Sequence, residues 1–120
     1  MISKKIENLD SFHGEEGSEI KQIFDPQNTS SGIRFSLAQI IIAPGKSSKL
    51  HKMKSAEVYF ILEGNGIIHV GEESQKIEKN QSIYISPSSN QCLENTGQSN
   101  LKVLCIVCLL YTSPSPRDRG

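Results

Sequence analysis

The regular spacing of turn residues constrains this chain more than any other feature. Glycine, proline, asparagine or serine interrupts short apolar stretches about every 8–12 residues, and helical periodicity is scarce. This spacing is typical of an all-β sandwich or barrel. No internal repeat supports a propeller or a solenoid. The strands are expected at Glu19–Phe24, Ile33–Ala43, Ala56–Glu63, Gly66–Val70, Gln75–Glu78, Ser82–Ser86, Gln91–Asn95 and Leu101–Val107.

The stretch from Glu57 to Leu62 indicates how a strand is buried. Side chains alternate between the two faces of a strand, so Glu57 and Tyr59 share one face, and the other face is entirely apolar. Both faces are largely apolar, which favours a closed or two-layered β fold. A carboxylate beside such a strand costs on the order of several kcal/mol unless it is paired, hydrogen-bonded or bound to a cation. Glu57 is therefore a candidate site residue.

Composition narrows the function classes. The chain has 120 residues, enough for one domain, with 13 basic and 13 acidic residues and a formal net charge of zero. Without a basic excess, nucleic acid and acidic membrane surfaces are not expected as partners. No apolar run is long enough to span a bilayer or to form a signal peptide, so we expect a cytoplasmic protein. Three cysteines at these spacings make neither a disulfide framework nor a zinc motif.

The C-terminal residues differ in character from the rest of the chain. Residues 108–118 resemble one reading frame of a sequencing-library adapter, and their Ser/Pro/Arg composition shows no periodicity. We therefore expect a single domain over residues 1–107 and a non-native tail over 108–120. A genuine disordered tail is the alternative.

A group of residues near the middle of the chain resembles the first motif of the cupin superfamily. That motif is Gly, five residues, His, one residue, His, three or four residues, Glu, six residues, Gly. Here Gly45, His51, Glu57 and Gly64 have the same spacing, and only the second His is replaced, by Met53.

The second cupin motif is degenerate in this chain. The aligned positions are Asn80, Ser86, Ser88, Gln91 and Asn95, with Pro87 displaced by one place. Only the final Asn is kept, and the second motif as a whole lies about thirty residues after Glu57. Together the two motifs cover residues 45–95. The resemblance implies a jelly-roll β-barrel, the double-stranded β-helix of RmlC-like cupins.

The resemblance also implies a divalent metal ion inside the barrel, such as Mn, Fe, Zn, Ni or Cu. Even numbers of residues separate His51, Met53 and Glu57, so in one extended segment their side chains project from the same face. With Gln91 from a facing strand, the expected ligands are His51, Glu57 and Gln91. The thioether of Met53 is a poor ligand for Mn or Fe(II) and suits Cu(I). A metal-free polar pocket that includes Tyr59 is the alternative.

Lysines surround the first motif, at Lys46, Lys49, Lys52 and Lys54. At the mouth of a barrel they would attract an anionic ligand such as a sugar phosphate or a carboxylic acid. We therefore expect Lys52, Lys54, Met53 and Tyr59 to contact a small-molecule ligand, whereas a solvated loop is the plainer interpretation of the lysines.

Three function classes remain open from the sequence. The first is a binding or sensing module. The second is a metal-dependent enzyme, either a sugar-phosphate isomerase, as among mannose-6-phosphate-isomerase-like cupins, or a dioxygenase. The third is an interaction scaffold, which Glu57 disfavours. The short chain with two apolar strand faces predicts a homodimer. Among the remaining residues, His69 is expected at the surface, and Cys92 and Cys105 are expected to be small buried side chains.

Overall fold

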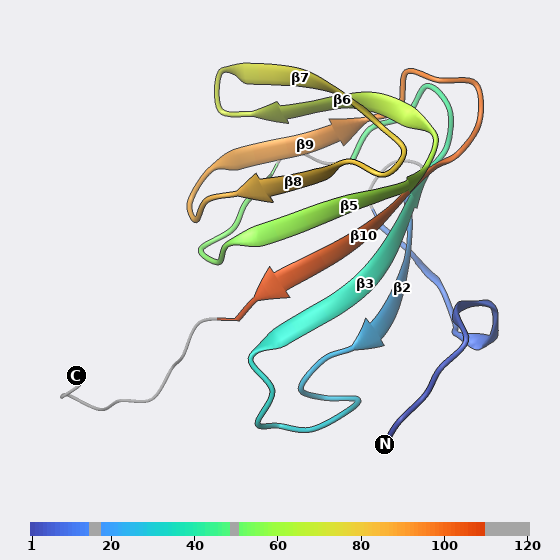
Figure 1. The fold of residues 1–120 in the computed structure, drawn as a ribbon, viewed down its shortest axis with the longest axis vertical. Helices are drawn as coiled ribbons and strands as arrows, with labels where there is room; N and C mark the ends of the chain where they lie inside the picture. The colour runs from blue at the N-terminus through green and yellow to red at the C-terminus, as the bar shows by residue number, and fades with distance from the viewer. Residues whose placement is uncertain (15–17, 49–50, 110–120) are drawn as a thin grey trace, which may run out of the picture.

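The computed structural model describes residues 1–14, 18–48 and 51–109. These residues form one short 3-10 helix, η1, and ten strands (Figure 1). In chain order the elements are η1 (Ile6–Asn8), β1 (Phe12–His13), β2 (Ser18–Phe24), β3 (Phe35–Ile42), β4 (His51–Lys52), β5 (Glu57–Glu63), β6 (Asn65–Val70), β7 (Glu73–Glu78), β8 (Ser82–Ile85), β9 (Asn90–Glu94) and β10 (Leu101–Cys108).

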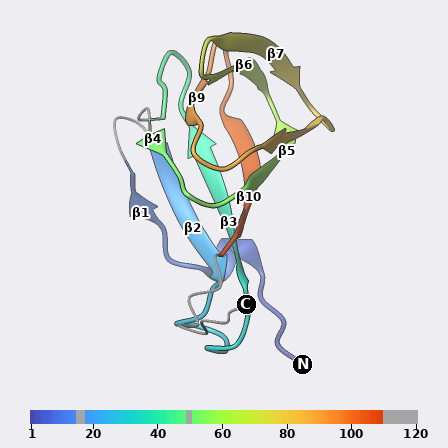
Figure 2. The same cartoon turned by 90° about the vertical axis from the view of Figure 1, so that its left-hand side faces the viewer.

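The strands pair into two antiparallel sheets. Sheet A has the strand order β1-β2-β3-β10-β5-β8, and sheet B has the order β4-β9-β6-β7. Successive strands often lie in different sheets, as β7 and β8 do, so the chain passes repeatedly from one sheet to the other. This is the all-β jelly-roll architecture that the sequence predicts. Both views place the hairpin of β6 and β7 at the end of the molecule away from the N-terminus (Figure 2).

The hydrophobic core lies between the two sheets. Sheet A contributes Ile42 and Ile61, and sheet B contributes Leu93 and Ile77, each at most 2 % exposed. These side chains occupy alternate positions of their strands, as a period of two requires. Burial of apolar area at roughly 25 cal/mol per Å² makes this shared layer the main stabilising contribution to the barrel.

All eight strands expected from the sequence are confirmed, with ends that differ by no more than two residues. The two-residue strands β1 and β4 were not predicted, because such short pairings leave no alternation to detect. Strand β10 continues through Cys108, and the Leu109 N–H donates to the Arg34 carbonyl at 2.8 Å. The strand thus extends slightly into the stretch expected to be non-native, and residues 110–120 lie outside the described part of the chain.

The glycine between β5 and β6 is required by the geometry of the turn. Gly64 has a φ of 88°, in the left-handed region. A Cβ atom at this position would lie 2.6 Å from the Asn100 carbonyl oxygen. Only glycine combines an easy positive φ with the absence of a Cβ atom, so this glycine of the first motif has a structural role.

The outer face of sheet A carries an apolar row. In register, Tyr84 of β8 lies beside Val58 of β5, then Ile106 of β10 and Leu37 of β3. Tyr84 is 67 % exposed and Ile106 is 38 % exposed. The row therefore crosses four neighbouring strands and is only partly covered. Separately, no helix in the described ranges is long and apolar enough to cross a membrane.

Candidate functional site

A cluster of polar side chains lies in the interior of the barrel. Glu57 and Tyr59 point inward from β5 of sheet A, and each is 3 % exposed. Gln91 points inward from β9 of sheet B and is 1 % exposed. Alternation left open which face of β5 is inward, and the burial pattern shows that it is the face of Glu57 and Tyr59. Buried polar groups of this kind must be hydrogen-bonded to be stable.

The amide of Gln91 connects the cluster across the two sheets. The Tyr59 hydroxyl donates to Gln91 Oε1 at 2.6 Å, and Gln91 Nε2 donates to Glu57 Oε1. On the other side of the carboxylate, the Cys105 thiol donates to Glu57 Oε2 at 3.4 Å. We call Glu57, Tyr59, Gln91 and Cys105 the inner cluster. Each of its members has a hydrogen-bond partner within it.

Burial keeps the phenol and the thiol of the inner cluster protonated. Desolvation raises the pKa of Tyr59 well above its ordinary value, and the neighbouring Cys105 and Glu57 raise it further. Desolvation also raises the pKa of Cys105, and the charge of Glu57 and the hydrogen bond to Glu57 raise it further. Tyr59 and Cys105 therefore act as neutral hydrogen-bond donors, and Cys105 is not poised as a thiolate nucleophile.

A cavity of about 390 Å³ lies beside the inner cluster. Its lining comes from β6, β7 and β8: Ile68, Val70, Glu73, Ser74, Gln75, Ile83 and Tyr84. Val70 is the register partner of Gln91, and Ile83 is the register partner of Tyr59. The cavity is thus bounded by direct neighbours of the cluster. It lies between β7 and β8, which are edge strands of the two sheets.

The segment that precedes Glu57 differs from the expectation. The sequence predicts one extended segment from His51 to Glu57, but the chain bends at Lys54 and Ser55, so β4 ends at Lys52. The regular alternation of side chains between two faces is therefore interrupted, and the face of His51 cannot be inferred from the face of Glu57. The backbone of His51 pairs with Gln91, and the His51 side chain lies outside the described part of the structure. Met53 follows β4, is half-buried, and accepts a hydrogen bond from the Ser88 N–H through its carbonyl at 2.6 Å.

The lysines near the first motif are exposed. Lys46, Lys52 and Lys54 are all in contact with solvent, and Lys49 lies outside the described residues. None of the three described lysines lines the cavity of about 390 Å³. An effect of these lysines on ligand binding would therefore be exerted through space.

Cys105 belongs to the site, although the sequence predicts only a small buried residue there. It lies in β10 directly opposite Tyr59. It shares its inward face with Leu101 and Val103, both fully buried. Because Cys105 lies two and four residues after these apolar positions, alternation along the strand predicts that its thiol faces the interior. Its contact with Glu57, however, depends on the pairing of β10 with β5.

The last residue of the second motif has a structural role. Asn95 is 1 % exposed, and its Nδ2 donates to the carbonyls of Ile42 at 2.8 Å and Ser99 at 2.9 Å. The Gly45 N–H donates to the Asn95 carbonyl at 3.1 Å. The start of the first motif is thus joined to the end of the second.

The orientation of Gln91 bears on the expected metal ion. A cation bound by both Glu57 and Gln91 requires the amide oxygen of Gln91 to face the carboxylate. Here Gln91 Nε2 faces Glu57, and the amide oxygen accepts a hydrogen bond from the Tyr59 hydroxyl. Within the described ranges, no group of three or more His, Cys, Asp or Glu side chains could hold a metal. With the amide as it lies, Gln91 and Glu57 do not share a cation, and the amide would have to turn so that its oxygen faces the carboxylate.

Comparison with known proteins gives one family match and several relatives. A family model described as Cupin domain matches residues 38–107. An uncharacterized protein of Methanocaldococcus jannaschii, MJ1618, is 34 % identical over 106 residues, which cover 88 % of this chain and 84 % of the relative. An oxalate-binding protein of Thermotoga maritima is 31 % identical over 74 residues, 61 % of each chain.

A solved structure supports the fold. The crystal structure of a predicted oxalate decarboxylase from Thermotoga maritima superposes with a TM-score of 0.81. The sequence identity is 20 %, and the match covers 91 % of this chain and 100 % of the other. At this identity the likeness concerns the architecture alone.

Proposed function

Because the chain belongs to the cupin family, we propose that it binds a small molecule in the barrel, in the cavity beside the inner cluster. The observation that carries the proposal is the buried Glu57–Gln91–Tyr59 network next to a cavity of about 390 Å³. Ligand pockets commonly measure about 300–1,000 Å³ and combine apolar walls with a few fixed polar groups. Val70 and Ile83 would be the apolar walls, and Glu73 and Gln75 are polar residues that line the cavity. The inner cluster lies behind these walls, as the register neighbour of Val70 and Ile83.

The charge of Glu57 selects among ligands. A carboxylate in this setting repels an anion and attracts a hydrogen-bond donor. Without a cation, the cluster therefore suits a neutral polar molecule with a hydroxyl or amide group. This metal-free pocket is the form that the orientation of Gln91 favours.

The second candidate is a metal-held carboxylic acid, which the resemblance to an oxalate-binding protein favours. A divalent cation would offset the charge of Glu57 and would allow an anionic ligand to approach. Its ligands would be His51, Glu57 and Gln91, as the sequence predicts, with the Gln91 amide turned so that its oxygen replaces Nε2. The exposed lysines would add to the attraction of an anion.

A thermal-shift experiment with two variables separates these forms. The purified chain is heated with and without MnCl₂ or ZnCl₂, and with and without sodium oxalate. In the metal-free form, oxalate gives no shift under any condition, and a neutral diol or amide library contains the stabilising ligands. A stabilisation by oxalate that requires the cation supports the metal-held form. If no small molecule raises the melting temperature under either condition, the proposed binding function is wrong.

Restoring imidazoles gives a matched control for metal binding. The double variant Met53→His and Gln91→His completes the family pattern of three imidazoles and a carboxylate. We expect elemental analysis to find more bound divalent metal in this variant than in the parent chain. Equal, full loading of both proteins would contradict the metal-free form.

We also propose that the chain forms a homodimer through the outer face of sheet A. The partly exposed row of Tyr84, Val58, Ile106 and Leu37 supports this, because an apolar surface across four strands gains from a second copy. Ile106→Lys is expected to produce a monomer in light scattering. Ile2→Lys, at a residue that is 54 % exposed near the N-terminus, is the control and should leave the mass unchanged.

A further inference from the structure

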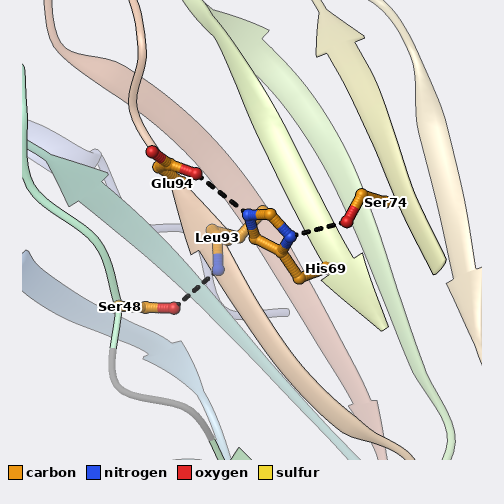
Figure 3. Close-up of polar contacts among 5 residues, drawn as sticks. All are labelled: Ser48, His69, Ser74, Leu93 and Glu94. Carbon is orange, nitrogen blue, oxygen red and sulfur yellow. Dashed lines mark hydrogen bonds and ion pairs between the residues drawn. The ribbon is translucent and has the colours of Figure 1, made fainter. Parts of the chain in front are cut away.

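A second polar group, outside the barrel, carries a chemistry that the proposed ligand site does not use. His69 of β6 lies on the outer face of sheet B, as the sequence predicts, with Ser74 of β7 opposite it in register and Glu94 of β9 on its other side (Figure 3). His69 Nε2 lies 2.9 Å from Glu94 Oε1, and His69 Nδ1 lies 2.8 Å from Ser74 Oγ. We call these three residues the outer array.

The carboxylate determines how the imidazole is protonated. A carboxylate only accepts hydrogen bonds, so Glu94 holds the proton of the neutral ring on Nε2. Nδ1 then carries the lone pair and accepts the hydrogen bond from the Ser74 hydroxyl. A hydroxyl bound to a base, with the base oriented by a third group, is the arrangement that activates a serine nucleophile.

The backbone of Ser74 adds a donor beside this hydroxyl. Strands β6 and β7 are joined by a two-residue turn that begins at Gly71, with a φ of 60°. In such a hairpin the closing pair, Val70 and Glu73, exchanges hydrogen bonds, and the next pair does not. Ser74 belongs to that next pair, so its N–H points toward the free edge of β7. An N–H at this position can stabilise an oxyanion.

The hydroxyl is accessible to an acyl donor from solvent. Ser74 is exposed on the edge strand β7, and its hydroxyl lies on the outer face beside His69. The array itself is open to solvent, with 35 % of the His69 side chain and 43 % of the Glu94 side chain exposed. A small ester can therefore reach the hydroxyl without a rearrangement of the barrel.

We propose that Ser74 is a nucleophile that accepts the acyl group of an activated ester, with His69 as the general base and Glu94 as a positioning residue. Ser74 Oγ forms a bond to the carbonyl carbon while its proton passes to His69 Nδ1. The bond between that carbon and the oxygen of the leaving group breaks, the electron pair stays on that oxygen, and His69 gives it the proton, which returns the ring to its neutral form. His69 then takes a proton from a water molecule as the water oxygen bonds to the carbonyl carbon of the acyl-serine. The bond from that carbon to Ser74 Oγ breaks, the carboxylic acid leaves, and His69 returns the proton to Ser74.

The test uses p-nitrophenyl acetate and the full chain. Release of p-nitrophenolate is followed by absorbance, and peptide mass mapping locates the acetyl group. We expect acetyl-Ser74 in the parent chain and none in Ser74→Ala. His69→Ala should lower the rate of acetylation at Ser74 by about 10²-fold or more, the contribution of a positioned general base. Ser82→Ala, at an exposed serine of β8, is the matched control and should not change the rate.

Two further variants separate positioning from folding. Glu94→Gln keeps an oxygen that can accept from Nε2, whereas Glu94→Ala does not, so Glu94→Gln should retain more acetylation than Glu94→Ala. Far-UV circular dichroism and the melting temperature establish that each variant is folded. If Ser74→Ala does not fold, the mapped acetyl site in His69→Gln gives the same answer. Absence of acetyl-Ser74 in the parent chain, or equal acetylation without His69, would overturn the proposal.

Discussion

The inner cluster and the outer array contain similar groups in opposite surroundings. Each has a carboxylate on one strand bonded to a nitrogen on another, but Glu57 is 3 % exposed and the side chain of Glu94 is 43 % exposed. In the interior, each hydrogen bond replaces lost solvation, so its loss is costly. At the surface, water competes for the same groups, and an exposed pair contributes little to stability. The inner cluster therefore stabilises the fold, and the outer array is free to serve reactivity.

Two thiols, one buried and one half-buried, are expected to show the largest effect of this contrast. Cys105 belongs to the inner cluster, whereas Cys92 is the register partner of His69 on the outer face and is half-buried. Burial raises the pKa of both thiols, but Cys105 becomes accessible only when the barrel opens. With iodoacetamide at about pH 8, Cys105 should react about 10³-fold more slowly than Cys92. Peptide mapping over time measures both rates, and equal rates would contradict the burial of the inner cluster.

Removal of the bridging amide is expected to have the next largest effect. Gln91→Ala deletes the acceptor of the Tyr59 hydroxyl and one donor to Glu57, and it leaves a small void. We expect the free energy of unfolding to fall by about 3 kcal/mol in urea denaturation. Glu94→Ala, the control on the outer face, should change it by less than about 1 kcal/mol. Similar losses in the two variants would remove the distinction between the clusters.

Removing the hydroxyl from a buried and from an exposed tyrosine is expected to give a smaller difference in the free energy of unfolding. Tyr59→Phe removes one buried hydroxyl and should lower the free energy of unfolding by about 1–2 kcal/mol, because the oxygen of Gln91 loses its donor. Tyr84→Phe alters a residue that is 67 % exposed and should change stability by less than about 0.5 kcal/mol. Chemical denaturation of both variants measures the difference. A stable Tyr59→Phe protein would indicate that water or a ligand replaces the hydroxyl.

The smallest effect is expected from the outer array itself. His69→Ala should lower the free energy of unfolding by less than about 1 kcal/mol, because water competes for the exposed partners of the ring. Urea denaturation of the variant and the parent chain measures this difference. A loss of several kcal/mol would show that the array is structural and would weaken the case for a reactive Ser74.

Sequence reasoning was most successful where the information is local. Alternation along residues 57–62 was sufficient to place Glu57 and Tyr59 on one face of a strand that is buried on both sides, and the cost of a buried charge identified Glu57 as a site residue. The turn at Gly64 and the spacing of the strands are local signals as well. These features predict a closed or two-layered β fold, and the resemblance to the cupin motifs specifies the jelly roll.

Contacts that depend on strand pairing were beyond the sequence. Cys105 reaches Glu57 only because β10 pairs with β5, and the outer array needs the register of three strands at once. The bend at Lys54 and Ser55 also broke the parity from which the role of Met53 was inferred. Non-local register and irregular backbone are the two properties that periodicity does not encode.

The open side of the barrel has a consequence for how the molecule behaves at high concentration. Strand β7 leaves a row of backbone donors and acceptors unpaired in its sheet, which in many proteins would recruit a strand from a neighbouring molecule. Here Glu73, Lys76 and Glu78 lie along that strand, and incoming backbone would have to desolvate their charges. The protein can thus keep an entrance for small molecules between its sheets and still resist polymerising through it.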